Sequence, residues 1–383
     1  RLVMQELIEL EATEMIGAAR YERSDGRTNE RNGHRPRLLS TQAGDIELKI
    51  PKLSHGSFFP SLLAPRRRID QALHAVIMQA YVEGVSTRSV DDLVQALGID
   101  SGISKSEVSR ICARLDIEVD AFRNRSLAHV EFPYVYLDAT YVKARDTDLH
   151  QVVSRAVVIA TGITANGDRE VLGLAVGDSE AETFWTEFLR SLRRRGLAGV
   201  KLVISDAHEG LKAAARKTLQ GASWQRCRVH FARNLLALVP KGHQDVVAAA
   251  LRTVFVHPNR TEIAAAWDRT ADMLARQFPK VKTLMDEAKI DVLAFSAFPP
   301  DHWRKIWSNN PLERLNKEIK RRTNVVQIFP NNGAIIRLVG AVLAEQHDDW
   351  STHRHYLSEG SMAKLYKPRD TDTATDDGIL AIT

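Results

Sequence analysis

The sequence predicts a mixed α/β fold, with helices packed on a mixed β-sheet, and three observations support this. Strand-like runs follow one another closely at Tyr134–Leu137, Val152–Thr161 and Val171–Val176. A helix over about 180–195 and a fourth strand at Lys201–Ile204 come next. Long helical patterns lie on both sides of this region. Strands in succession, followed by alternating helix and strand, are typical of a sheet covered by helices.

The N-terminal segment predicts a helix over residues 1–20, because Leu2, Leu7, Leu10 and Ile16 are spaced to form one apolar stripe. The stretch Tyr21–Arg37 is basic and rich in polar residues, so it predicts a solvated loop or arm. Alternating residues from Asp45 to Ile50 predict a strand that Pro51 ends. Together these predict a small β element that carries positive charge.

Residues 66–130 return to a helical pattern and contain a candidate helix-turn-helix at 84–116. In such a motif the second helix enters the major groove of DNA. The side chains that would face the groove are Ser104, Lys105, Ser106, Ser109 and Arg110, and Ser104 is also available as a helix N-cap. Helical hairpins are common, and a plain hairpin is the alternative. The basic arm at Arg23–Arg37 and the run Arg66–Arg68 would add phosphate contacts, or they are simply solvated.

After the fourth strand, the pattern predicts a helix over 208–219, a short strand at Ser223–Cys227 and mostly helix over 229–295. A long helix begins near Pro311, a residue that suits a first helical turn. The tail from Lys367 is polar and predicts disorder. Trp224, Trp303 and Trp307 are interpreted as core residues rather than platforms on which bases stack.

Composition limits the function classes. The 383 residues are 44% hydrophobic and 26% charged, which suits a globular protein of two or three domains. The net charge of +5 favours a polyanionic partner without establishing one. Two cysteines, Cys112 and Cys227, imply no disulfide framework. No run of about 18 apolar residues or secretory leader occurs, so we expect a cytoplasmic protein with no membrane contact. Since the chain begins at Arg1, we expect residues before it.

Two aspartates follow strand-like runs and are candidate metal ligands. Asp138 comes at the end of PYVYLDAT, and Asp206 follows the strand in VKLVISDAHEGL. Each could simply cap the turn or helix that follows. Two strands that end in aspartate instead favour metal-dependent phosphoryl transfer, because Mg²⁺ takes carboxylate oxygens and positions the attacking and leaving oxygens.

The third candidate carboxylate lies on the basic helix that begins near Pro311. Leu312, Leu315 and Ile319 share its apolar face, and seven Lys and Arg residues occur between Arg304 and Arg322. This density suits phosphate contacts. The spacing alone does not separate a catalytic Glu313 from a Glu313–Lys317 surface pair, and it does not choose Glu313 over Glu318.

Several long motifs resemble the Mutator-like family of bacterial insertion-sequence transposases. They are YLDATYVKAR, VISDAHEGL, SWQRCRVHFARN and NPLERLNKEIKRRTNVVQIFPNNGAIIRLVGAVLAEQHDDW, and the N-terminal YERSDGRTNERNGHRPR and GDIELKIPKL agree with them. The likeness covers almost the whole chain. It implies that Asp138, Asp206 and Glu313 are the catalytic residues and the ligands of Mg²⁺, with Mn²⁺ as a substitute. It also implies a ribonuclease-H-like catalytic core with a helical insertion between Asp206 and Glu313.

The resemblance makes Cys227 and His230 characteristic positions. We interpret them as packing and polar support near the active site, since structural zinc needs four ligands and no second pair lies nearby; metal ligation is the alternative. Tyr141 and Lys143 either position a DNA phosphate or cover the strand edge. The residues expected to contact DNA are those of the candidate recognition helix named above together with Lys143, Arg314, Lys317, Lys320 and Arg321.

The expected domain organisation has six parts. Residues 1–65 form the helix, arm and β element, 66–130 the helix-turn-helix region, and 131–239 the first part of the core. Residues 240–299 form the helical insertion, 300–350 the final part of the core with the helix of the catalytic glutamate, and 351–383 the tail.

The predicted function is strand cleavage by hydrolysis and strand transfer by the freed 3′-hydroxyl, on double-stranded DNA. Two alternatives remain: a ribonuclease-H-like nuclease that only hydrolyses, and a DNA-binding protein without cleavage. We expect at least a homodimer on DNA in the bacterial nucleoid, since two ends are joined; the resemblance implies that a circular intermediate could precede integration.

Overall fold

The computed structural model describes residues 2–18, 22, 26–41, 44–54, several positions between 72 and 80, 105–146, 151–178, 181–352 and 355–367. The chain divides into two compact units, Arg1–Asp70 and Gln71–Thr383, and each is described by itself. The predicted disorder of the tail from Lys367 concerns residues that lie almost entirely outside this description.

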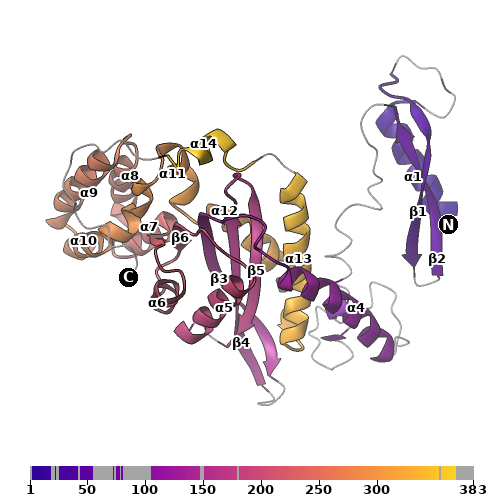
Figure 1. Ribbon diagram of the computed structural model, residues 1–383, viewed down its shortest axis with the longest axis horizontal. Helices are drawn as coiled ribbons and strands as arrows, with labels where there is room; N and C mark the ends of the chain where they lie inside the picture. Colours follow the sequence, from indigo (N-terminus) through magenta and orange to yellow (C-terminus); the bar gives the residue numbers. More distant parts are fainter. Residues whose placement is uncertain are drawn as a thin grey trace. The chain divides into compact units, whose positions relative to one another are not determined.

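The N-terminal unit packs helix α1 (Leu2–Ile16) against a two-stranded antiparallel sheet of β1 (Arg31–Thr41) and β2 (Gly44–Leu53) (Figure 1). Its core contains Ile8, Ala12, Ile16, Leu48 and Ile50. The predicted apolar stripe was wrong at Leu10, which is 61% exposed. Ile8, Ala12 and Ile16 are spaced by four and share a face, whereas a residue two positions from Ile8 points elsewhere.

Two further predictions for this unit were wrong. The arm at Tyr21–Arg37 is not a loop throughout, because residues from Arg31 onward form β1. Pro51 does not end the second strand, which continues to Leu53. Each strand of a two-stranded sheet has one unpaired edge, so a proline without an N–H group fits where its nitrogen would face that edge.

The second unit contains a six-stranded mixed sheet, which confirms the predicted mixed α/β class. Strands β3 (Tyr134–Asp146), β4 (Gln151–Ile163) and β5 (Arg169–Gly177) pair antiparallel in succession. Strands β6 (Leu202–Ser205) and β7 (Ser223–Arg226) then add in parallel on the other side of β3, giving the order β5-β4-β3-β6-β7. A short strand, β8 (Ile328–Phe329), also pairs with β3.

Asp138 lies inside β3 rather than at its end, so the predicted strand boundary was wrong. Pairing between β3 and β4 continues without a break to Asp146. The sequence hides this extension because the exposed Tyr141, Lys143 and Arg145 alternate with the buried Thr140, Val142 and Ala144. The far part of the hairpin is therefore amphipathic rather than uniformly apolar.

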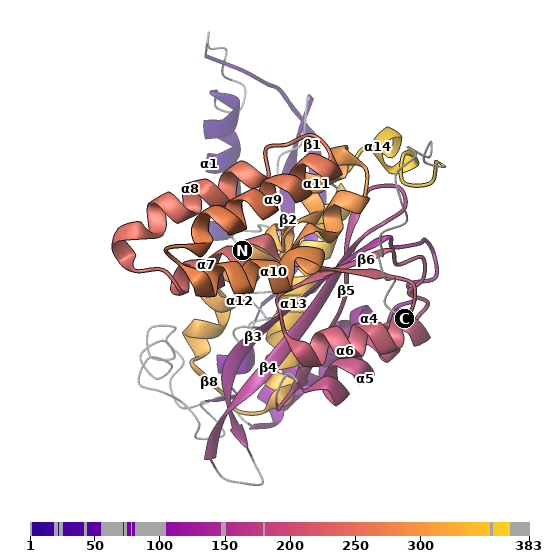
Figure 2. The same ribbon diagram turned by 90° about the vertical axis from the view of Figure 1, so that its left-hand side faces the viewer.

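Helices cover both faces of the sheet (Figure 2). On one face, α5 (Glu182–Arg194) and α6 (Glu209–Thr218) pack on a core that includes Val135, Leu137 and Val203. On the other face of the sheet, α13 (Asn332–Thr352) contacts β5, α12 (Asn310–Val326) contacts β3, and α10 (Pro279–Leu293) contacts β7. Successive residues of a strand point to opposite faces, so Tyr134, Tyr136 and Asp138 belong to the α12 face.

The mostly helical stretch predicted over 229–295 is confirmed. It contains α7 (Arg228–Ala237), α8 (Gln244–Val254), α9 (Arg260–Ala275) and α10, and α11 (Pro300–Ile306) follows it. Buried Gln225 of β7 connects them to the sheet: its Nε2 donates to Val292 O at 2.8 Å, and its Oε1 accepts from Phe295 N at 2.7 Å. The guanidinium of Arg228 lies 3.8 Å from the ring centroid of Trp307. Trp224 and Trp303 are buried, as predicted, and Trp307 is half-buried.

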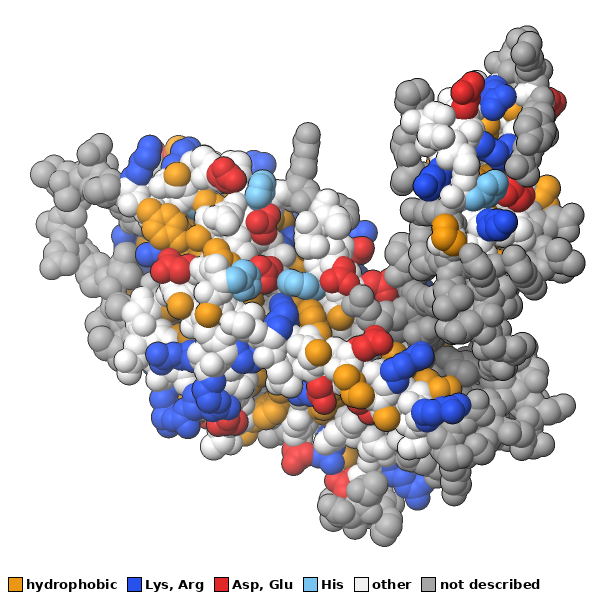
Figure 3. Space-filling model, turned by 45° about the vertical axis from the view of Figure 1, so that its right-hand side comes forward, with side chains coloured by type: hydrophobic (Ala, Val, Ile, Leu, Met, Phe, Trp, Pro, Cys, Tyr) orange, Lys and Arg blue, Asp and Glu red, His pale blue; other side chains and the backbone are white. Residues whose placement is uncertain are grey.

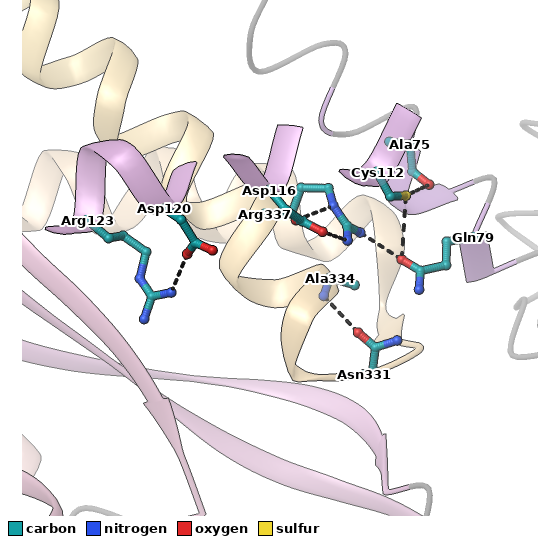
Figure 4. Close-up of polar contacts among 9 residues, drawn as sticks. All are labelled: Ala75, Gln79, Cys112, Asp116, Asp120, Arg123, Asn331, Ala334 and Arg337. Atoms are coloured by element: carbon teal, nitrogen blue, oxygen red, sulfur yellow. Dashed lines mark hydrogen bonds and ion pairs between the residues drawn. The ribbon is translucent and has the colours of Figure 1, made fainter. Parts of the chain in front are cut away.

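Helix α4 (Lys105–Asn124) packs on α13. Figure 4 shows Arg337 of α13 donating to both carboxylate oxygens of Asp116, at 2.8 and 2.7 Å, and to Gln79 Oε1 at 2.7 Å. The second helix of the predicted helix-turn-helix is thus a helix, while its first helix and turn, including Ser104, lie outside the described residues. A short α14 (Glu359–Ala363) follows α13. Within the described part of the chain, no helix has the length and apolar character needed to cross a membrane.

Candidate active site

The parallel pairing of β3 and β6 brings Asp138 and Asp206 to neighbouring positions. Tyr134 pairs with Leu202 and Tyr136 with Ile204, an offset of 68 residues that sets Asp138 opposite Asp206. Neighbouring strands lie about 4.8 Å apart. Asp206 follows the last residue of β6 and, like Asp138, belongs to the face that carries α12. The two aspartates therefore form an acidic pair on one face of the sheet.

Neither aspartate has the capping role that the sequence left open. Asp138 lies within a strand, with no turn directly after it. The N-cap of α6 is His208, whose side chain accepts a hydrogen bond from Leu211 N. Within the described part of the chain, the Asp206 carboxylate accepts a hydrogen bond only from the adjacent Ala207 N, at 2.7 Å to Oδ1. Local helix capping thus does not account for this pair.

Burial and neighbouring charge change the acidity of Asp138. Burial is the largest effect and raises the pKa of its carboxyl to about 6, and the charge on Asp206 acts in the same direction. The Ala139 N–H, the charge on His230 and the Asn316 side chain lower this pKa. Two carboxylates that share a partly buried site repel each other, so a cation between them would be stabilised.

Cys227 and His230 lie beside this pair. A hydrogen bond with the Cys227 side chain raises the pKa of His230 to about 9, and the charges on Asp206 and Asp138 add to the effect. Cys227 is buried and free of any disulfide; its N–H donates to Ser205 O at 2.7 Å, and its Sγ accepts from Asn309 N at 3.4 Å. These bonds join β6, β7 and the beginning of α12.

Helix α12 brings Glu313 to the same face. Leu312, Leu315 and Ile319 are buried, as predicted, and this fixes which side of the helix faces the sheet. Glu313 is half-buried, and its Oε1 lies 3.8 Å from Arg233 Nη2, so the cation nearest to it in the described chain is Arg233 rather than Lys317. The Glu313 Oε1 atom is buried and has no hydrogen-bond partner in the structure.

Glu318, the alternative, is engaged elsewhere. Its carboxylate accepts from Arg321 at 2.7 and 2.9 Å and from Arg322 at 2.9 Å. These bonds, with that of Arg321 the largest effect, lower the pKa of Glu318 to about 2. Glu318 is thus part of a surface ion-pair cluster, whereas Glu313 lies one turn before Asn316, the residue that contacts Asp138.

The α12 residue in direct contact with Asp138 is Asn316, which sequence reasoning missed. Its Nδ2 donates to Asp138 Oδ2 at 2.5 Å. Asn309 makes a parallel contact, with its Nδ2 donating to Leu137 O at 3.0 Å. Amides on a helix have no periodic pattern of their own, so only the pairing of α12 with β3 identifies them. Among the described residues, no three His, Cys, Asp or Glu side chains converge closely enough to hold a metal ion.

The residues expected to contact DNA are on several surfaces. Arg314, Lys317, Lys320 and Arg321 are exposed on α12, and Ser109 and Arg110 are exposed on α4. Lys105 and Ser106 belong to α4, but their side chains lie outside the description. Tyr141 and Lys143 are exposed on β3, an odd number of residues from Asp138 and hence on the opposite face. Figure 3 shows separate groups of Lys and Arg with acidic side chains between them.

Comparison with known proteins identifies the family. Residues 1–353 match the family model described as "Transposase, Mutator family". The transposase for insertion sequence element IS1081 of Mycobacterium tuberculosis is 46% identical over 372 residues, which are 97% of this chain and 88% of that protein. The transposase for IS406 of Burkholderia multivorans is 40% identical, over 94% of this chain and 92% of that protein.

The transposase for IS256 in transposon Tn4001 of Staphylococcus aureus is 37% identical, over 93% of this chain and 91% of that protein. These matches run through both units of the structure and include the strands and the helix that carry Asp138, Asp206 and Glu313. The chain therefore belongs to the Mutator family of transposases, enzymes that catalyse DNA transposition.

Proposed function

We propose that this transposase cuts and joins DNA at the ends of an insertion sequence, with Asp138, Asp206 and Glu313 as its catalytic carboxylates. The observation that carries the proposal is the register of β3 and β6, which sets Asp138 opposite Asp206 on the face covered by α12. Asn316, one turn after Glu313, contacts Asp138 directly, so α12 holds Glu313 near the pair. Helical residues three positions apart are neighbours on one face.

We propose that the sheet is a ribonuclease-H-like core interrupted by the helices α7 to α11. Three antiparallel strands in succession, extended by two parallel strands beside β3, support this. The position of the helices between β7 and α12 also supports this core. These helices separate Asp206 from Glu313 in the sequence, while α12 still packs on the sheet that carries Asp138 and Asp206.

The chemistry of these side chains, rather than their spacing in this structure, fits a divalent cation. Carboxylate and amide oxygens are the ligands that Mg²⁺ prefers, and Mn²⁺ accepts the same set. Buried oxygens without a hydrogen-bond partner gather at this face: Glu313 Oε1, Asn316 Oδ1 and Thr140 Oγ1. Leaving such atoms unpaired costs about 1–3 kcal/mol each, which a bound cation or its water would offset. Asp138, Asp206 and Glu313 would hold Mg²⁺, which would supply electrostatic stabilisation of the phosphoryl transition state.

The reaction has two steps. Water attacks the phosphorus at the element end, the bond between phosphorus and the 3′-oxygen breaks, and that oxygen takes a proton. The freed 3′-hydroxyl then attacks a second phosphodiester, where one bond forms as another breaks, so no external energy source is required. Exposed Arg314, Lys317 and Lys320 on α12 would orient the DNA backbone through its phosphates.

The test uses the full chain, a labelled duplex that carries the element's own end, and Mg²⁺ or EDTA. We expect nicking at the end and joined products, both lost in EDTA. Nicking without joining would support a nuclease that only hydrolyses, and binding without nicking in either Mg²⁺ or Mn²⁺ would support a DNA-binding protein. Because two ends take part in joining, we also expect the protein to be at least a dimer on DNA.

A further inference from the structure

We propose that Asn316 is a positioning residue for strand cleavage, one that orients the Asp138 carboxylate and sets the place of Glu313 beside it. The inference rests on the proposed function, because it concerns the metal site of the same reaction. It assigns a role to a residue that is neither one of the three carboxylates nor one of the basic residues expected to contact DNA.

Asn316 completes the set of donors around the Asp138 carboxylate. Its Nδ2 donates to Oδ2 at 2.5 Å, and the Ala139 N–H donates to Oδ1 at 3.0 Å. One donor on each oxygen fixes the plane of the carboxylate. Each oxygen has two lone pairs, so a lone pair on each remains for a cation. Without Asn316, Oδ2 would lose its donor and the side chain could rotate.

A second amide, that of Asn309, adds another hydrogen bond between the α12 region and β3. Glu313 and Asn316 are three residues apart on one face of α12, and Asn309, the N-cap residue of this helix, lies four residues before Glu313. Asn309 is fully buried and donates to Leu137 O at 3.0 Å, directly before Asp138 in β3. The two amides thus bind successive residues of one strand, with Glu313 between them on the helix. This arrangement fixes how far α12 can slide along β3, and therefore where Glu313 lies.

The remaining atoms of this face indicate that a ligand belongs there. Asn316 Oδ1 and Glu313 Oε1 are both buried and lack a hydrogen-bond partner. Both are acceptors, so the missing partner is a donor or a cation. Buried polar atoms in proteins are nearly always paired. Residues that hold a metal ligand in place commonly affect metal affinity about 10- to 100-fold.

The fold does not depend on Asn316. Helix α12 is attached by the buried side chains Leu312, Leu315, Ile319 and Val326 and by Asn309. Asn316 itself is half-buried, and among the described residues its side chain hydrogen-bonds Asp138 alone. Removal of its side chain should therefore change the site without unfolding the helix.

The experiment compares Asn316→Ala with Asn324→Ala, which removes the same side chain from an exposed position on the same helix. Three readouts are taken on the full chain: Mn²⁺ affinity by calorimetry without DNA, the Mg²⁺ concentration that gives half-maximal cleavage, and the Tm of the metal-free protein. We expect Asn316→Ala to weaken Mn²⁺ binding and to raise the half-maximal Mg²⁺ concentration by about tenfold or more, with Tm close to that of Asn324→Ala. Asn324→Ala should match the wild type throughout.

Wild-type metal dependence in Asn316→Ala would overturn the assignment. If the Tm of Asn316→Ala falls well below that of the control, a second variant, Asn316→Leu, keeps the approximate side-chain shape and removes the amide. Weakened Mn²⁺ binding by Asn316→Leu at a restored Tm supports the assignment. A lowered Tm with unchanged Mn²⁺ binding contradicts it. A wild-type protein that neither binds Mn²⁺ nor cleaves contradicts the proposed function. If the wild type binds Mn²⁺ and cleaves DNA, and Asn316→Ala does so equally well, only the role of Asn316 is contradicted.

Discussion

Two glutamates on α12 that look equivalent in the sequence differ in what they contact. Glu318 accepts three hydrogen bonds from Arg321 and Arg322, and these hold its pKa at about 2. Glu313 has a buried oxygen without a hydrogen-bond partner, and its nearest arginine, Arg233, lies 3.8 Å away. A carboxylate already satisfied by two arginines is a poor metal ligand, because binding would break those bonds. Side-chain surroundings, rather than spacing, therefore distinguish the candidate catalytic residue.

The buried His302 gives a prediction about stability and pH. Its Nδ1 accepts from the Tyr134 hydroxyl at 2.6 Å and its Nε2 donates to Ser361 O at 3.0 Å, while burial lowers its pKa. The unfolded chain takes up a proton on this residue near its usual pKa of about 6.5, and the folded chain does so only at lower pH. This contribution to stability is therefore complete above about pH 6.5 and is lost as the pH falls toward the lowered pKa.

We expect the Tm of the wild type to fall between about pH 7.5 and 5.5 more than that of His302→Gln, which has no titrating group at this position. Thermal melts of both proteins at the two pH values measure the difference. Equal falls in Tm would show that His302 does not titrate differently in the folded and unfolded states.

At the scale of elements, Gln225 attaches the helices α7 to α11 to the sheet. It is fully buried and bonds both Val292 O and Phe295 N. Gln225→Leu leaves both backbone groups unpaired, so we expect the free energy of unfolding to fall by about 2–5 kcal/mol. Urea denaturation measures it, with Gln220→Leu at an exposed position as the control, for which we expect a change within about 0.5 kcal/mol. Similar losses in the two variants would mean that Gln225 contributes little to this attachment.

The contact between α4 and α13 requires a glycine at position 340. A Cβ atom there would lie 2.4 Å from Val119 Cγ1. Gly340→Ala should therefore lower the free energy of unfolding by about 1–3 kcal/mol, and Val119→Ala in the same chain should restore most of the loss. A double-mutant cycle by chemical denaturation measures the coupling. Additive effects of the two substitutions would contradict direct contact.

The sequence predicted the elements that have one dominant apolar pattern. The β6 strand, α5, α6 and the apolar face of α12 fall where the periodicity places them. Elements whose pattern is mixed were missed in part. Gly33 and Pro36 obscure β1, and the polar residues after Leu137 obscure the second half of β3. In both cases a partner strand supplies the hydrogen bonds that local propensity does not predict.

For the candidate site, the sequence could identify carboxylates that follow apolar runs but not their surroundings. The pairing offset between β3 and β6 that sets Asp138 opposite Asp206 depends on tertiary packing. The same holds for Asn316, Asn309 and Arg233, whose partners are between 80 and 178 residues away in the sequence. An isolated asparagine on a helix carries no signal of such a contact. Resemblance to a family identified the three carboxylates, and the fold supplies the contacts around them.

At the scale of the whole molecule, the two units have separate cores. Residues 71–383 contain the sheet and all three proposed carboxylates, and the N-terminal unit has its own apolar cluster. We expect a chain of residues 71–383 to unfold cooperatively and to bind its DNA end about tenfold or more weakly than the full chain, because it lacks the basic residues of the N-terminal unit. Thermal melts and gel-shift titrations at fixed salt measure this. Unchanged affinity would exclude the N-terminal unit from DNA-end binding.

The most direct test of the proposed catalytic site is the comparison of Glu313→Gln with Glu318→Gln in cleavage of a duplex carrying the element's own end. Both substitutions remove one negative charge from the same helix and preserve side-chain shape. We predict that Glu313→Gln lowers the rates of nicking and joining about a thousandfold or more, equivalent to about 4 kcal/mol, while DNA binding persists. Glu318→Gln should cleave at close to the wild-type rate. Normal cleavage by Glu313→Gln, or equal losses in the two variants, would contradict the assignment of Glu313 to the catalytic site.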